Sequence, residues 1–197
     1  MRKQLTLITF LHFIALTVWA QHGDFATAVE VCEKKEFTFQ HCEGAGKNPK
    51  EADLIPCFIT GTTLGNAEKN ATWFTFNVKE DGLLTFVITP TQAKDDFDFV
   101  VFQLPEKGVY NAEKQIVRCM AAGSGGKRKS PCFGATGLRE NETYTARDSG
   151  CNDPDDNAFL APLVVKKGEF YALLVSNMTS GNGFTIRFNG TAELGCE

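Results

Sequence analysis

Residues 71–104 read ATWFTFNVKEDGLLTFVITPTQAKDDFDFVVFQL, and they contain three strand-like runs. In the first run, Phe74, Phe76 and Val78 alternate with the positions between them, which is the period of a strand with one buried face. The sequence Glu80-Asp81-Gly82 supplies a turn before the second run, and an acidic group opens the third. This stretch therefore predicts consecutive antiparallel strands in the core of a β-sandwich.

The rest of the chain continues this rhythm of short strands and turns. Strands are expected at Glu36–Gln40, Cys57–Thr60, Thr72–Val78, Leu83–Thr89, Phe97–Leu104, Gln115–Met120, Leu160–Val165, Phe170–Asn177 and Gly183–Asn189. Eight or nine short strands in one domain predict an all-β fold, an antiparallel sandwich of the jelly-roll kind. Ala26–Lys34 is expected to form at most a short turn, and residues 121–156 a long loop.

The first twenty residues have the pattern of a secretory signal peptide. Arg2 and Lys3 precede an apolar stretch from Leu5 to Val18, and the small residue Ala20 marks a cleavage point before Gln21. No later segment has the apolar length of a membrane span. We therefore expect a secreted protein with a signal peptide at 1–20 and a single domain at 21–197.

The charge balance excludes some partners. The chain has 20 Lys+Arg and 24 Asp+Glu, a net charge of −4, and loss of Arg2 and Lys3 leaves 18 against 24, or −6. Nucleic acids and anionic membranes attract basic proteins, so neither is an expected partner.

All seven cysteines lie after the predicted signal peptide. Export favours disulfides over metal thiolates, and no Cys-x-x-Cys pair is present. We expect a bond between Cys119 and Cys132, because it would close the Gly-rich loop between them and contribute roughly 3 kcal/mol. The other pairings stay open, and the odd count leaves one thiol free or bonded to another molecule.

Two acidic groups offer the oxygen ligands that calcium prefers. Asp96 and Asp98 alternate on one face at the start of the third run, whereas Asp95 is expected to point elsewhere. The second group, Asp153-Pro154-Asp155-Asp156-Asn157, lies on the long loop and is placed to close onto the first. The predicted calcium ligands are Asp96, Asp98, Asp153, Asp155 and Asp156, and the alternative is a solvated acidic loop end.

No catalytic set stands out. After the signal peptide the histidines are His22 and His41, and no Gly-x-Ser-x-Gly elbow is present. His41 beside Cys42 suggests a Cys–His pair, but a disulfide is the expected state of that cysteine. Carboxylates are plentiful, yet no sequence feature selects the pair that a glycosidase needs. We expect no enzymatic activity.

Glycan binding needs exposed aromatic rings. Tyr110 and Tyr144 are the candidates because they fall in predicted loops, whereas Trp73 and Tyr171 lie in strands. Asn-x-Thr sequons, which are glycosylation sites where the source has that pathway, stand at Asn70, Asn141, Asn177 and Asn189.

Several segments together resemble a known class of module. They are Asp96–Pro105, Arg118–Gly123, Gly134–Leu138, Asp156–Leu163, Phe170–Asn177 and Gly183–Ala192. Between roughly Ala71 and Ala192 the chain resembles the jelly-roll surface and adhesion modules of large exported Bacteroidetes proteins. It is distantly similar to pre-peptidase C-terminal and CUB-like β-sandwiches. The resemblance implies a non-catalytic module for adhesion or glycan binding, often with a calcium ion.

The sequence therefore predicts a secreted binding module that recognises a surface glycan or an exported protein. One alternative is an extracellular matrix protein that self-associates through an unpaired cysteine. The other is a carbohydrate-active enzyme.

Overall fold

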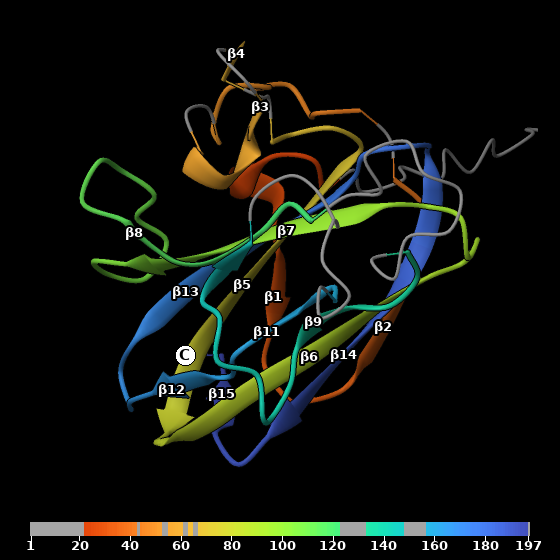
Figure 1. The fold of residues 1–197 in the computed structure, drawn as a ribbon. Helices are drawn as coiled ribbons and strands as arrows, with labels where there is room; N and C mark the ends of the chain where they lie inside the picture. The colour runs from red at the N-terminus through yellow and green to blue at the C-terminus, as the bar shows by residue number, and fades with distance from the viewer. Residues whose placement is uncertain are drawn as a thin grey trace, which may run out of the picture.

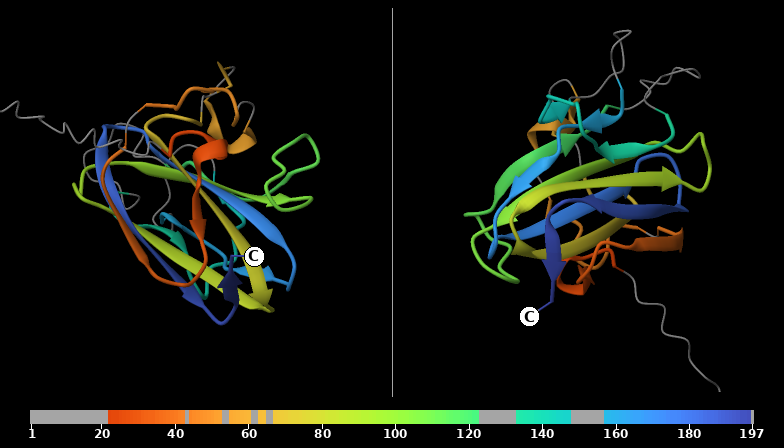
Figure 2. Two further views of the ribbon diagram at one scale, coloured as in Figure 1. Left: turned by 180° about the vertical axis from the view of Figure 1, so that it is seen from behind. Right: turned by 90° about the horizontal axis from the view of Figure 1, so that it is seen from below.

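The structure is a computed structural model that describes residues 22–42, 44–52, 55–60, 63–64, 67–122, 133–147 and 157–196. Two β-sheets pack face to face and form a sandwich (Figures 1 and 2). This confirms the predicted all-β class. Among the described residues, no helix has the length and apolar character needed to cross a membrane. The predicted signal peptide lies outside the described residues.

The first sheet, sheet A, has the strand order β1-β5-β13-β7-β8-β10, with β15 also paired to β5. Its strands are β1 (Val29–Val31), β5 (Ala71–Glu80), β13 (Phe170–Asn177), β7 (Phe97–Leu104), β8 (Gln115–Met120), β10 (Ala146–Arg147) and β15 (Glu193–Gly195).

The second sheet, sheet B, has the order β11-β9-β6-β14-β2, with β12 also paired to β6. Its strands are β11 (Phe159–Leu160), β9 (Thr136–Leu138), β6 (Gly82–Pro90), β14 (Asn182–Gly190), β2 (Glu36–His41) and β12 (Leu163–Val165). The remaining elements are the short pair β3 (Ile59–Thr60) and β4 (Thr63–Leu64) and the 3-10 turns η1 (Phe25–Thr27) and η2 (Pro56–Phe58).

The main strands have the nested pairing of a jelly roll. In chain order they are β2, β5, β6, β7, β8, β9, β13 and β14. The first pairs with the last (β2 with β14), the second with the seventh (β5 with β13), and so inward through β6 with β9 to β7 with β8. These pairs are all antiparallel, as expected for a jelly roll. The short strands β1, β10 and β11 add parallel pairs, so both sheets are mixed rather than purely antiparallel.

Aromatic side chains fill the space between the two sheets. Phe74 from β5 and Phe99 from β7 face Phe86, Phe184 and Phe188 from sheet B, and all are essentially inaccessible to solvent. Their rings meet mostly edge to face, as in the pair of Phe86 and Phe99 with centroids 5.1 Å apart. Such contacts stabilise a core beyond the area they bury.

A second layer covers the outer face of sheet A. We call the described residues between Gly44 and Asn70 the covering segment; it crosses one end of the sandwich, where β3 and β4 lie, while β15 lies at the other end (Figure 1). Ile55, Cys57 and Phe58 from this segment pack in one buried cluster with Trp73 and Phe102. The expectation that β5 buries only one face is therefore wrong, because Trp73 on its outer face is fully buried.

The covering segment is tied to the sandwich at several points. A disulfide joins Cys57 to Cys119 of β8, and the Ser176 hydroxyl donates to the carbonyl of Ala67. Asn70 donates through its side-chain amide to the carbonyl of Asn177. These bonds fix the segment over the outer face of sheet A.

Candidate functional site

Asp95 and Asp98, from the acidic group at the start of β7, have different surroundings in the structure. The buried carboxylate of Asp95 accepts hydrogen bonds from Ser180 Oγ (2.9 Å) and Asn182 Nδ2 (2.9 Å), with longer contacts to Asn177 and Thr179. These donors come from the end of β13 and the start of β14, so Asp95 fixes the loop that joins the two sheets. The Asp95 carboxylate is therefore occupied by hydrogen bonds to this loop.

Asp98 is a buried acid of a different kind. Its side chain is 5% exposed, and Oδ1 has no hydrogen-bond partner among the described residues. Burial, and secondarily the charge of Asp96, raises the pKa of Asp98 well above its usual value. Asp98 lies opposite Ser176 on β13. The other predicted calcium ligands, Asp153, Asp155 and Asp156, lie outside the described residues.

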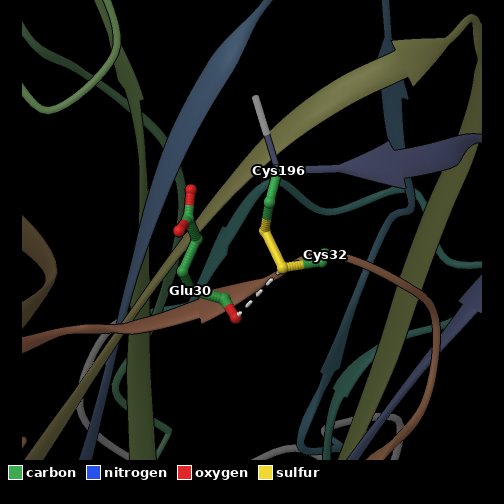
Figure 3. Close-up of side chains that lie close together, drawn as sticks. All are labelled: Glu30, Cys32 and Cys196. Atoms are coloured by element: carbon green, nitrogen blue, oxygen red, sulfur yellow. Dashed lines mark hydrogen bonds between the residues drawn. A yellow bond between two sulfur atoms is a disulfide. The ribbon is translucent and has the colours of Figure 1, made fainter.

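One group of three potential metal ligands within 4.8 Å of one another occurs in the described part of the chain: Glu30, Cys32 and Cys196. Figure 3 shows that the two sulfurs belong to a disulfide. A disulfide sulfur is a poor ligand compared with a thiolate, so this group is a covalent link and not a metal centre.

The disulfides differ from the predicted pairing. Cys119 is bonded to Cys57, with their Cα atoms 6.1 Å apart, so the predicted bond from Cys119 to Cys132 is wrong. The reason is that the covering segment brings Cys57 directly over β8. Cys132 lies outside the described residues. Cys32 is bonded to Cys196 across a sequence separation of 164.

Cys42 is the free cysteine among the described residues. Its side chain is 2% exposed, and it accepts a weak hydrogen bond from the Thr72 hydroxyl. Burial raises the pKa of the Cys42 thiol to about 11. This thiol is therefore a poor candidate for a bond to another molecule and for the nucleophile of a Cys–His pair.

Tyr110 is a packing residue. Its ring stacks on Phe25 (centroids 4.9 Å apart) and meets the edges of Trp73 and Phe102, while Lys114 Nζ lies 4.4 Å from its centroid. Because these neighbours occupy the ring, Tyr110 does not present the open aromatic face that was expected of a sugar platform.

Tyr144, in contrast, is 58% exposed. It lies just before β10, and the guanidinium of Arg147 sits 4.4 Å from its ring centroid. The backbone carbonyl of Tyr144 accepts a hydrogen bond from Ala161, which fixes the loop. A guanidinium against one part of the ring restricts its motion and leaves the remaining surface to solvent.

The sequons differ in accessibility. Asn141 and Asn189 are exposed, whereas Asn177 is fully buried and its amide donates to the carbonyl of Asn182. Asn70 is half-buried and has its amide bonded to Asn177. Asn189, although exposed, has its side-chain amide within 3.4 Å of the carbonyl of Arg187. The buried and half-buried sequons, Asn177 and Asn70, are thus the less accessible pair.

Sequence reasoning missed Glu68. This carboxyl is 1% exposed, accepts hydrogen bonds from Trp73 Nε1 (3.2 Å) and from the amide of Ala52 (3.3 Å), and has a pKa raised by burial to about 7. The residue stands alone in the sequence, without a motif around it. Its role depends on a fold-back of the covering segment that no local pattern reveals.

Comparison with known proteins gives no match to the chain, whether to a protein-family model, a curated protein or a solved structure.

Proposed function

We propose that this protein is a secreted, non-catalytic binding module and that its ligand is a surface glycan. The observation that carries the proposal is Tyr144, an exposed ring held by Arg147 at the edge of sheet A. Sugar rings stack their C–H faces on such aromatic rings, and a neighbouring guanidinium donates hydrogen bonds to hydroxyl or carboxylate oxygens. The jelly-roll fold and the resemblance to exported adhesion modules also favour this function.

Binding to immobilised polysaccharides tests the proposal. Tyr144→Ala should weaken retention roughly fivefold, since an aromatic stacking contact contributes about 1 kcal/mol. Tyr144→Phe should retain binding because it keeps the ring. Val164→Ala is the matched control, since Val164 is 72% exposed on β12 of the other sheet. Equal binding by the wild type and Tyr144→Ala would refute this site, and binding to an exported protein instead would favour the other ligand class.

We also propose that calcium stabilises the module through Asp96 and Asp98. The supporting observation is the buried Oδ1 of Asp98, which has no hydrogen-bond partner in the described part of the chain. Calcium coordinates six to eight oxygens, so further ligands are needed, and Asp153, Asp155 and Asp156 remain the predicted ones. A chelator should lower the melting temperature of the wild type by several degrees. The melting temperature of Asp98→Asn should be the same with and without the chelator. A chelator-insensitive wild type would refute calcium binding.

A self-associating matrix protein is the first alternative. The buried state of Cys42 argues against a cross-link through that thiol. A monomeric band on non-reducing electrophoresis would exclude covalent self-association.

A carbohydrate-active enzyme is the second alternative. Glu51 and Glu68 are neighbouring carboxyls, and the raised pKa of Glu68 would suit a general acid. However, Glu68 is buried between residues 44–52 and sheet A and is closed to a substrate. Release of sugar products by the wild type, lost in Glu51→Gln, would favour this alternative over the proposal.

A further inference from the structure

The carboxyl group of Glu68 joins two parts of the molecule. Oε1 accepts a hydrogen bond from the indole of Trp73 on β5, and Oε2 accepts one from the amide of Ala52 in the first half of the covering segment. Trp73 is fully buried against Phe102 and Tyr110. Glu68 therefore connects residues 44–52 to the outer face of sheet A.

The same part of the covering segment is bound to the N-terminal turn η1. Glu51 Oε2 accepts a hydrogen bond from the amide of Phe25 (2.7 Å), and the carboxylate of Asp24 accepts from the amides of Lys47 and Asn48. These bonds lie nearer the surface than those of Glu68. Glu68 is thus the inner attachment of residues 44–52, and the bonds to η1 are the outer one.

The groups that face Glu68 are acidic. Burial is the largest cause of its raised pKa, and the charge of Glu51 raises it further, while the hydrogen bonds from Ala52, Trp73 and the Glu51 amide lower it. Tyr110, from the loop after β7, has its hydroxyl buried and its pKa raised by burial and by these two carboxyls, so it stays neutral. Lys114 lies over the ring of Tyr110.

We propose that Glu68 is a proton-controlled clasp that holds residues 44–52 of the covering segment on sheet A. The neutral carboxyl can stay buried between Trp73 and Ala52 because no charge has to be removed from water. An ionised carboxyl in the same place is disfavoured by desolvation and by Glu51, and lifting residues 44–52 lets water reach it. Residues 44–52 are then closed on sheet A at acidic pH and open as the pH rises through neutrality, while the disulfide of Cys57 keeps the rest of the covering segment in place.

The size of the effect follows from proton linkage. The closed state binds the proton with a pKa of about 7, and the open state with the ordinary value of 4.5. Closing is therefore favoured most below pH 4.5 and weakens as the pH rises through 7. Between pH 5.5 and 8.5 the equilibrium constant for opening should rise roughly 30-fold.

The test is a pH titration of the full chain by NMR, with Trp19→Phe so that Trp73 gives the only indole signal. The Trp73 Nε1–H resonance should shift with a midpoint near pH 7. The hydrogen-exchange protection factor of the Ala52 amide should fall roughly 30-fold from pH 5.5 to 8.5. Glu68→Gln, which keeps the shape and the acceptor oxygen, should abolish both changes.

Glu51→Gln is the matched control, because it removes the neighbouring charge and leaves Glu68 in place. In this variant the titration should persist with a lower midpoint. A Trp73 resonance and an Ala52 protection factor that do not change between pH 5.5 and 8.5 would overturn the proposal, as would a titration that survives in Glu68→Gln. If Glu68→Gln does not fold, the wild-type titration and the direction of the Glu51→Gln shift decide the matter.

Discussion

Removal of the disulfide between Cys57 and Cys119 should destabilise the protein substantially. The bond closes a loop with a sequence separation of 62. In the chain-entropy treatment, a loop of this length restricts the unfolded chain by about 4 kcal/mol at 25 °C. Replacement of both residues by alanine is the suitable change, since both side chains are buried and a single replacement would leave a reactive thiol.

Urea unfolding measures this loss. The free energy of unfolding should fall by about 4 kcal/mol, and the m-value should rise because an uncrosslinked unfolded chain exposes more surface. Cys42→Ala is the control, because it removes a buried sulfur without opening a loop and should cost about 1–2 kcal/mol. A loss for the double variant no larger than that of the control would show that the bond between Cys57 and Cys119 does not constrain the chain as described.

Further outcomes follow from individual side chains. The contribution of Glu68 to the free energy of unfolding should fall by about 3 kcal/mol as the pH rises from 4.5 through 7, and urea melts of Glu68→Gln should lack this component. Gly183→Ala should destabilise the β2–β14 pairing by more than 2 kcal/mol, because an added Cβ would lie 1.8 Å from the carbonyl oxygen of Phe39, whereas Gly195→Ala has room and should be nearly neutral by thermal denaturation. Cys42 should resist a thiol reagent at pH 8 until the protein unfolds, and reaction in the native state would contradict its burial.

The long strands could be predicted from the sequence because their patterns are local. Phe97–Leu104, Gln115–Met120 and Phe170–Asn177 have the predicted bounds. Strands β1, β4, β9, β10 and β15 were missed, since two or three residues are too few to show a period. The predicted strand Leu160–Val165 is divided into β11 and β12 at Ala161 and Pro162, which agrees with the missing backbone donor of proline.

The covering segment was not foreseen, because its burial depends on contacts distant in sequence. The predicted strand Cys57–Thr60 is instead the turn η2 followed by β3, and the cysteine at its start reaches β8. The expected bond from Cys119 to Cys132 assumed that the nearer cysteine is the partner. Strand alternation also gave no sign of the four donors around Asp95, which come from the end of β13, the start of β14 and the loop between them, more than eighty residues away.

The disulfide between Cys32 and Cys196 has a mechanical consequence. It brings two Cα atoms separated by 164 positions in the sequence to within 4.7 Å, next to β1 and β15 at the edge of sheet A. A pull applied to the chain before β1 and after Cys196 loads the pairing of β1 with β5, because β1 precedes Cys32. Between Cys32 and Cys196 the load passes through this one covalent bond, so the strands between the two cysteines are not loaded. The strands between Cys32 and Cys196 are therefore protected from tension along the chain, and reduction of this single bond would transfer the load to them.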